Sequence, residues 1–250
     1  PPTWLRRQRQ MCIRDRVFTV FAFGFQTANA QFWNDVKDKV KEEVTGSSSS
    51  LTDGEIGSGL KEALVNGIKK GVDQVSQPDG YFKDLAIKIL LPEEMEKAEK
   101  TLRKIGFDKQ VDEAIESMNR AAEDAAKEAT DIFLVAIKAM TFEDALNILK
   151  GEQDAATQYL DNSTRTTLTE KFQPIIQTSL EKVNATKYWE TIVSKYNKVP
   201  FVQKVNPDLD AYVTEKALDG LFHQIAKQEA EIRTNPGART TDLLKKVFSN

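Results

Sequence analysis

The sequence predicts an all-α protein, and three features of its hydrophobic pattern support this fold class. Apolar residues recur at intervals of three and four, the repeat that places them on one side of a helix. Capping residues, Pro and Gly stand at the ends of these segments. No stretch shows the sustained alternation with β-branched residues that is typical of a strand. We therefore expect a single-domain bundle of about eight or nine helices, formed by residues 51–250.

The first thirty residues have the features of an export signal. Residues 17–25 (VFTVFAFGF) form an apolar run, and Ala28-Asn29-Ala30 follows the small-x-small pattern of a signal-peptidase site. The run is too short to cross a bilayer, which takes about 20 residues in a helix. We expect residues 17–30 to be a signal peptide cleaved after Ala30, which predicts a periplasmic protein. Residues 1–16, with the string RQRQMCIRDR, resemble translated adapter sequence and are interpreted as an artefact that precedes the natural start.

Removal of these thirty residues would leave an acidic chain without cysteine. Residues 1–16 carry five Arg and one Asp, so a formal net charge of −3 becomes about −7. An acidic surface disfavours nucleic acid and anionic membranes as partners. Cys12 lies in the removed part and is the chain's single cysteine, so no disulfide, thiolate nucleophile or Cys-ligated metal is expected.

Residues 31–50 are expected to form an amphipathic arm and a Ser-rich linker. The linker is Gly46 to Ser50, a composition typical of flexible connections. Two interpretations of the arm remain open: a loosely docked first helix, or a segment that binds a partner or a membrane. No transmembrane segment is expected after Ala30. The apolar face of the arm consists of Phe32, Trp33, Val36, Val40 and Val44.

The helical domain is expected to open with a long helix and a shorter one. Thr52 and Glu55 have the spacing of a capping box and predict a helix start there. Gly67 and Gly71 weaken that helix, so we expect them to lie against a close neighbour. A turn follows at residues 77–80, and a second helix is predicted over Glu93 to Ile105, started by Pro92 and ended by Gly106.

Residues 111–140 predict a long, Ala-rich central helix around which the others pack. The alanines in the middle of its apolar stripe let a neighbouring helix approach closely. The stripe consists of Val111, Ile115, Met118, Ala122, Ala125, Ala129, Ile132, Ala136 and Ala139.

The remaining helices are delimited by caps and prolines. Thr141 predicts a short helix through Leu149. Two separate helices are expected over residues 154–160 and 163–183, the second bent or broken near Pro174. Further helices are predicted over residues 187–196, from the Asn206-Pro207 cap through about Arg233, and over residues 242–248 after Thr241.

The sequence lacks the motifs that carry common catalytic chemistry, and no metal or cofactor is expected. One His and no mature Cys exclude the usual zinc sites. His223 has apolar neighbours and is interpreted as a partly buried, hydrogen-bonded residue. Neither a G-x-S-x-G nucleophile elbow after a strand nor a phosphate-binding P-loop is present.

Four polar residues of the central helix are candidates for a ligand site. Arg120, Glu123 and Asp124 are spaced either for solvated surface ion pairs or for a carboxylate–guanidinium site between helices. Asn119 shares an edge of the helix with apolar residues, so its amide should be partly buried and must find partners. It is expected to form a cross-helix hydrogen bond or one wall of a pocket.

A second candidate cluster combines Thr157, Tyr159 and Arg165. Aromatic residues at helical spacing usually belong to the core, with a polar group at its rim, so this cluster is either packing or part of a ligand site.

Five segments resemble the bacterial family called domain of unknown function 4197. The resemblance covers roughly residues 51–250. It implies an exported helical domain of Gram-negative bacteria, and it implies no activity, cofactor or catalytic residue. The segments are MNRAAEDAAKEA (118–129), MTFEDALNILKG (140–151), DAATQYL (154–160), NPDLDAYVTEKALDGLF (206–222) and RTTDLLKKVF (239–248).

These observations favour a non-enzymatic periplasmic protein that binds a small apolar or amphipathic ligand, or a protein partner, between its helices. One alternative is a hydrolase or lyase, with Glu123 or Asp124 as acid/base and Arg120 or Arg165 holding an anion. A second alternative is an envelope-associated structural protein that uses the Phe32/Trp33 arm as its contact.

Overall fold

The protein is all-α, as predicted. The computed structural model describes residues 52–248 apart from 183–184, 199, 202–203 and 207, and this part of the chain contains no strand. Residues 47–250 form one compact unit. The elements are α2 (Asp53–Val75), η1 (Glu93–Met95), α3 (Glu96–Lys104), α4 (Asp108–Ala126), α5 (Ala129–Ala139), α6 (Phe142–Lys150), α7 (Ala155–Lys182), α8 (Ala185–Tyr196), α9 (Leu209–Thr234), η2 (Pro236–Ala238) and α10 (Asp242–Val247).

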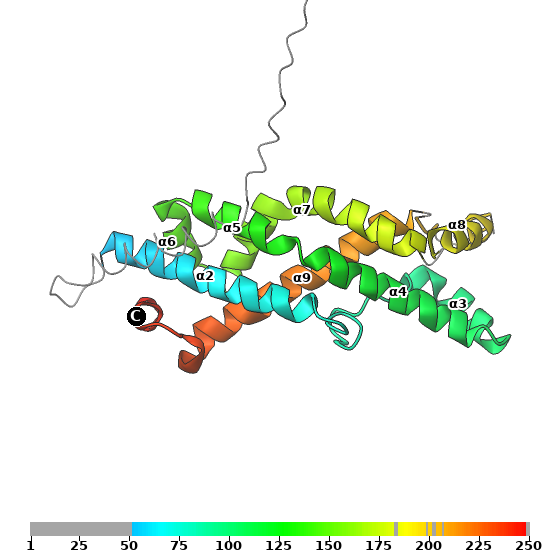
Figure 1. The fold of residues 1–250 in the computed structure, drawn as a ribbon, viewed down its shortest axis with the longest axis horizontal. Helices are drawn as coiled ribbons and strands as arrows, with labels where there is room; N and C mark the ends of the chain where they lie inside the picture. The colour runs from blue at the N-terminus through cyan, green and yellow to red at the C-terminus, as the bar shows by residue number, and fades with distance from the viewer. Residues whose placement is uncertain (1–51, 183–184, 199, 202–203, 207, 249–250) are drawn as a thin grey trace, which may run out of the picture. The chain divides into compact units, whose positions relative to one another are not determined.

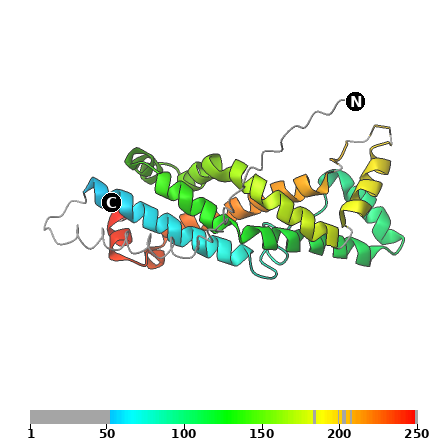
Figure 2. The ribbon, with the colours of Figure 1, turned by 45° about the horizontal axis from the view of Figure 1, so that its top comes forward.

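Helix α9 links the other long helices. It packs against α2, α4 and α7, and α4 and α7 also pack against each other. Figure 1 shows α9 in orange running diagonally across these helices, and Figure 2 shows α7 lying along α4 in a second view. The core therefore lies between α2, α4, α7 and α9, and α3 and α8 extend beyond it.

Helix α2 begins and packs as predicted. Thr52 Oγ1 accepts a hydrogen bond from Glu55 N at 3.3 Å, and Glu55 Oε2 accepts one from Thr52 N at 2.8 Å, which is a capping box. The two glycines of α2 face α9: a Cβ at Gly67 would lie 3.4 Å from Ile232, and one at Gly71 would lie 3.7 Å from the backbone of Gln224. The close approach expected from the glycine spacing is confirmed.

The prediction of one central helix over residues 111–140 is wrong, because two helices, α4 and α5, occupy this stretch. α4 ends at Ala126 and α5 begins at Ala129, with Glu128 N donating to Ala125 O at 3.1 Å in a tight turn at residues 127–128. The apolar stripe is buried from Val111 to Ala129, but beyond the turn the buried face shifts to Phe133, Leu134 and Ile137, and Ala139 is exposed. The turn contains neither Pro nor Gly, so the chain gives no local signal for it.

Helix α7 corrects the expectation of two helices over 154–160 and 163–183. It is continuous from Ala155 to Lys182 and retains Pro174 inside it. A proline in a helix interior costs about 3 kcal/mol. Burial of one uninterrupted stripe offsets that cost, because a residue at every fourth position is at most 3% exposed. The stripe consists of Leu160, Thr164, Leu168, Phe172, Ile176 and Leu180.

The caps of three helices, α6, α9 and α10, can be compared with their predictions. Asp208, rather than Asn206, caps α9 by accepting from Ala211 N at 2.9 Å. Asn206 Oδ1 instead accepts from the backbone N of the cap residue, Asp208, at 3.0 Å. Thr141 caps α6 and Thr241 caps α10, as predicted.

The expected artefact (1–16), signal peptide (17–30) and arm with linker (31–50) lie outside the described residues, as does Pro207. Within the described residues, no helix combines the length and the apolar character that crossing a membrane requires.

Candidate functional site

A groove of about 850 Å³ lies where α3, α4 and the adjoining ends of α7, α8 and α9 meet. This volume is in the range of small-molecule binding sites. Most of its lining is apolar, and the polar groups lie among residues that are partly exposed. The apolar lining consists of Leu91, Met95, Leu102, Phe107, Val111, Ala114, Met118, Ala121, Ala185, Trp189 and Leu209.

The floor of the groove is one face of α4. Ala114, Ser117 and Ala121 follow one another at helical spacing along it, and Val111 and Met118 flank them. Ser117 Oγ donates to Ala114 O at 2.9 Å, so its hydroxyl is satisfied within the helix. Ala114 and Ser117 are partly exposed, whereas Ala121 is fully buried, so a larger side chain at Ser117 would occupy the groove.

Helix α3 forms a wall with an incompletely covered apolar face. No residue of α3 is buried. Leu102 is half-buried in the groove lining, and the turn into α4 leaves Ile105 63% and Phe107 45% exposed. This edge of the groove therefore carries apolar surface that nothing in the described chain covers.

The opposite wall contains a fixed aromatic residue. The Trp189 ring stacks on Tyr212 with centroids 6.3 Å apart, and its Nε1 donates to Asn206 O at 3.3 Å. Burial raises the pKa of Tyr212 to about 12, so its hydroxyl stays protonated and donates to Leu90 O at 2.8 Å. These contacts hold the Trp189 ring rigidly against the groove.

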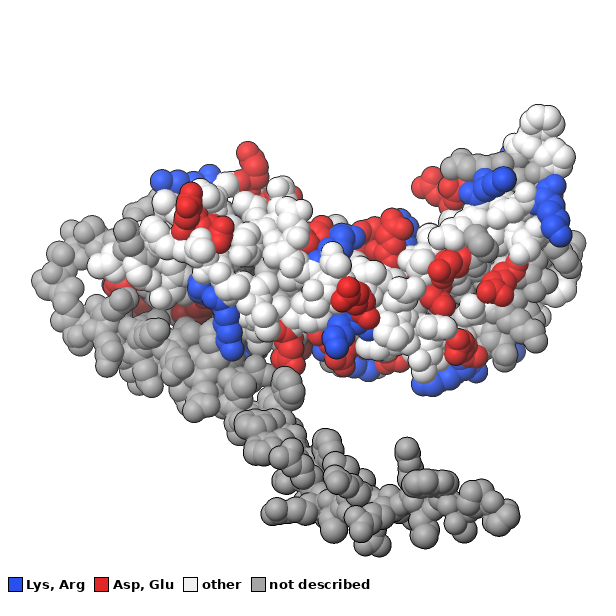
Figure 3. All heavy atoms as spheres, turned by 90° about the horizontal axis from the view of Figure 1, so that it is seen from above, with Lys and Arg blue, Asp and Glu red and all other residues white. Residues whose placement is uncertain are grey.

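Charged side chains occur along the rim of the groove. Over the face of the body shown in Figure 3, acidic and basic groups are interspersed without a block of one sign. At the groove itself, carboxylates outnumber cations. The acidic residues of the lining are Glu99, Glu113, Glu116 and Asp124, and its basic residues are Arg120 and Lys182.

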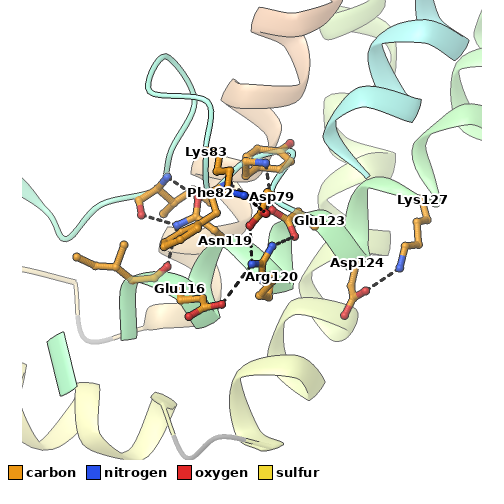
Figure 4. A network of polar contacts seen from close by, with 12 residues as sticks. Asp79, Phe82, Lys83, Glu116, Asn119, Arg120, Glu123, Asp124 and Lys127 are labelled. Carbon is orange, nitrogen blue, oxygen red and sulfur yellow. Dashed lines mark hydrogen bonds and ion pairs between the residues drawn. The ribbon is translucent and has the colours of Figure 1, made fainter. Parts of the chain in front are cut away.

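Arg120 is held by three carboxylates (Figure 4). Its Nη2 lies 2.6 Å from Asp79 Oδ1 and 3.2 Å from Glu116 Oε1, and its Nη1 lies 2.8 Å from Glu123 Oε2. Its guanidinium also lies over the Phe82 ring, 5.5 Å from the centroid. Lys83 first, and then Arg120, hold the pKa of Asp79 below its ordinary value. Arg120 therefore has little capacity left to bind a further anion.

Glu123 is buried and holds the backbone of the segment that follows α2. Its Oε1 accepts from Tyr81 N at 3.1 Å and from Phe82 N at 3.3 Å, and its Oε2 accepts from Arg120. Because both oxygens are occupied by structural partners, Glu123 acts here as a clamp on the chain. We call residues 79–91, which connect α2 to η1, the strap.

Asn119 fixes the other end of the strap. Its side chain is fully buried, where the sequence predicted partial burial of its amide. Ile89 N donates to its Oδ1 at 2.9 Å, and its Nδ2 donates to Ile89 O at 2.8 Å and Ile115 O at 2.7 Å. These bonds satisfy the backbone of the irregular strap in the core. Asn119 therefore binds the non-helical strap and its own helix, where the sequence had suggested a hydrogen bond to another helix or a pocket wall.

Asp124 lies apart from this network. Its Oδ1 is 2.7 Å from Lys127 Nζ, and both side chains are more than half exposed. Figure 4 shows the two pointing toward each other and away from Arg120. Asp124 nevertheless lines the groove, at its rim.

Thr157 binds a partner that sequence reasoning missed. Thr157 N and Oγ1 both donate to Glu229 Oε2 at 2.8 Å, and Ala156 N donates to Glu229 Oε1 at 3.0 Å. Arg233 Nη2 forms an ion pair with Glu229 Oε1 at 2.8 Å. A buried carboxylate from α9 thus satisfies the free amides at the start of α7. The spacing of Glu229 and Arg233 on α9 was the available signal.

Arg165 and Tyr159 lie elsewhere on α7. Arg165 forms ion pairs with Asp161 and with Asp219 Oδ1, the latter at 3.1 Å, and lies 5.1 Å from the centroid of the Phe222 ring. Tyr159 is half-buried, and burial raises the pKa of its hydroxyl.

The seven candidate residues therefore occupy three regions. Arg120 and Asp124 line the groove, and Asn119 and Glu123 hold the strap beside it. Thr157, Tyr159 and Arg165 lie on the α7 helix and do not belong to the groove lining.

His223 is exposed, which corrects the expectation of a partly buried histidine. It lies on the outer side of α9, where the helix turns its polar positions to solvent. No three His, Cys, Asp or Glu side chains of the described residues are grouped so that they could hold a metal ion.

Sequence reasoning did not find the groove as such. Part of its lining comes from α7 and α8, which are distant from α4 in the sequence, whereas α3 directly precedes α4. The available signal was α3, a strongly amphipathic helix with few large apolar residues to anchor it.

The fold and the groove define an all-α protein with a largely apolar groove walled by helices. Residues 50–249 match the model of the family described as "Protein of unknown function (DUF4197)", so the chain belongs to this family. Comparison with curated proteins and with solved structures gave no match.

Proposed function

We propose that this protein is a non-enzymatic binding protein, and that the groove along α4 takes the apolar part of an amphipathic ligand or partner. The supporting observation is the groove itself: about 850 Å³, apolar along its floor, and open along the uncovered face of α3. A site that is mostly apolar, with a few polar groups at its edge, is typical of ligand binding.

Its proposed location is the periplasm, after cleavage behind Ala30. The support is the apolar run over 17–25 and the Ala28-Asn29-Ala30 pattern.

The carboxylate-based hydrolase or lyase finds less support in the geometry. Both oxygens of Glu123 accept backbone or guanidinium hydrogen bonds, and Arg120 and Arg165 are each paired with two or more carboxylates. An acid/base residue needs a free oxygen facing the substrate. Asp124 faces the groove rim but lies apart from the other candidates.

A neutral apolar fluorophore, N-phenyl-1-naphthylamine, tests the proposal directly. It is titrated into the full chain and into the Ser117→Leu variant, which fills the floor of the groove. Saturable binding that is weakened at least about tenfold by Ser117→Leu is expected, because the new side chain removes the space for the probe.

Ser163→Leu is the matched control for this substitution. Ser163 is an exposed helical serine outside the groove, and its hydroxyl also donates to its own helix, to Tyr159 O at 2.7 Å. It should leave probe binding unchanged. Equal binding by the wild type and both variants would contradict the groove as the binding site.

A further inference from the structure

The lining of the groove follows a single face of α4 over several turns. Lining residues run from Gln110 to Asp124, which at the rise of an α-helix is about 21 Å. An occupant that follows this face over its full length would be matched by a helix of about four turns.

The floor has the character of a helix-packing surface. Ala114 and Ser117 are small, partly exposed and about one turn apart, so the backbone of a second helix could come close to α4 there, whereas Ala121 is already fully buried. Helix α3 beside them leaves Leu102 half-exposed, and Ile105 and Phe107 extend the apolar surface to the end of the groove. The groove thus has a floor of small residues on α4, a wall on α3 and an opposite wall at Trp189.

The rim adds a charge preference. The Glu113, Glu116 and Asp124 side chains are 62%, 50% and 53% exposed along the α4 edge. Their partners are neighbours on the same helix, Lys109 at 3.5 Å and Lys127 at 2.7 Å, with Arg120 at 3.2 Å. Such exposed pairs are weak, so these carboxylates remain open to cations from a partner.

Arg120 does not reverse this preference. Three carboxylates surround it, so the groove at its position is negative overall. An anionic headgroup placed there would meet Glu116 and Asp124, whereas Lys or Arg side chains would be attracted.

We propose that the occupant of the groove is a cationic amphipathic helix of a partner protein. Its apolar face would lie on the partly exposed Ala114 and Ser117, and its Lys or Arg residues would face Glu113, Glu116 and Asp124. This inference rests on the proposed binding function and names the class of partner. It is the helix-in-groove mode of peptide recognition.

The test uses two synthetic helices of about 20 residues, a length that favours helix formation in water. Both carry the same leucine face, and their polar face is Lys in one and Glu in the other. Binding to the full chain is measured by fluorescence anisotropy at low and high salt. The Leu/Lys helix should bind at least about tenfold more tightly than the Leu/Glu helix at low salt, and the difference should shrink as salt screens the charges.

Two triple variants separate the rim from the general charge of the protein. Glu113→Gln, Glu116→Gln and Asp124→Asn together should abolish the preference for the Lys helix. Glu152→Gln, Glu170→Gln and Glu215→Gln remove the same charge from exposed positions outside the groove and should leave the preference intact. Ser117→Leu should weaken binding of the Lys helix at least about tenfold.

The other outcomes are distinguishable. Equal affinity for both peptides, or loss of the preference in both triple variants alike, would overturn the cationic-helix inference. If the naphthylamine probe or laurate binds and responds to Ser117→Leu while neither peptide binds, the binding function stands and the helix inference fails. If neither the naphthylamine probe nor either peptide binds, the proposed binding function and the helix inference both fail. A dimer by light scattering that Ser117→Leu converts to a monomer would assign the groove to a second copy of the chain and overturn the inference.

Discussion

At the scale of single residues, buried polar side chains in this protein hold backbone that forms no regular structure. Asn119 and Glu123 bind the two ends of the strap, and Tyr81 fixes its start on α9 by donating from its hydroxyl to Ala217 O at 2.6 Å. Burial, reinforced by the charge of Glu123, raises the pKa of Tyr81, so this hydroxyl remains a donor. These three buried side chains and the backbone groups that they bind thus satisfy each other's hydrogen bonds.

Asn119→Ala should destabilise the protein by about 3 kcal/mol. The substitution leaves the N–H and the C=O of Ile89 without partners in the core, and each such loss costs about 1–3 kcal/mol. Urea unfolding measures the change, and faster hydrogen exchange at the Ile89 amide should accompany it. Asn162→Ala, at an exposed position of α7, is the control and should change the stability little. Equal effects from both would refute the clamp role of Asn119.

Gly220→Ala should also destabilise, although alanine favours a helix. A Cβ at Gly220 would lie 2.6 Å from Tyr81 Cε1 and 3.2 Å from Ile87 Cβ, so the strap must move. Overpacking costs about 1–3 kcal/mol, against a helix-propensity gain of up to about 1 kcal/mol. Gly57→Ala is the matched control, because its Cβ would lie 3.6 Å from Phe142, an ordinary contact. In thermal melts, Gly57→Ala should raise the melting temperature and Gly220→Ala should lower it. The reverse order would contradict the packing of Tyr81 on α9.

At the scale of secondary-structure elements, the starts of helices are the best-predicted features. The caps at Thr52 and Thr141 could be predicted from the sequence, because the partner of each lies only three residues away. The start of α7 was predicted to within one residue, at 154 against Ala155, but its cap was not, since Glu229 binds it from 72 residues further along the chain. The turn at residues 127–128 and the continuity of α7 through Pro174 were likewise missed, because packing between helices decides both.

Glu229→Gln should loosen the start of α7. The amide retains one acceptor but places an NH₂ group against amides that already donate, and it loses the ion pair with Arg233. Hydrogen bonds to a charged group contribute about 1.5–3 kcal/mol each, so we expect a loss of about 2 kcal/mol or more. Urea unfolding and hydrogen exchange at Ala156 and Thr157 report it. Glu215→Gln, exposed on the same helix, should have little effect; if it costs as much as Glu229→Gln, the cap is not the cause.

The cap of α6 should lose its stabilising effect in acid. The pKa of Asp144 lies below its ordinary value of 3.8, because its carboxylate accepts hydrogen bonds from the Thr141 side chain and backbone. A lowered folded pKa contributes stability that is complete above the unfolded pKa and is lost as the pH falls through the folded pKa. Asp144→Asn should therefore lower the melting temperature at neutral pH, and the difference from wild type should fade below pH 3.8.

Asp73→Asn, at an exposed position of α2, controls for the loss of one negative charge in this comparison. A melting difference for Asp144→Asn that stays constant from neutral to acidic pH would show that the Asp144 charge does not stabilise α6.

At the scale of the whole molecule, the fold class followed from periodicity, but the groove did not. Periodicity assigns each helix an apolar face without saying which faces meet, so α4 could be recognised and its partners could not. The incomplete cover of α3 becomes visible only when α3, α4 and α8 are placed together. Of the candidate residues, Arg120 and Asp124 lie at the groove because they share the α4 face that lines it, whereas Asn119 and Glu123 turn toward the strap.

The most direct test of the binding groove is native mass spectrometry of the protein purified from the periplasmic extract of a producing bacterium. The wild type and Ser163→Leu should both carry a reproducible additional mass, and Ser117→Leu should lose it, because only that substitution fills the floor of the groove. An additional mass that persists in Ser117→Leu, or a bare monomer in all three proteins, would contradict the groove as the site of binding.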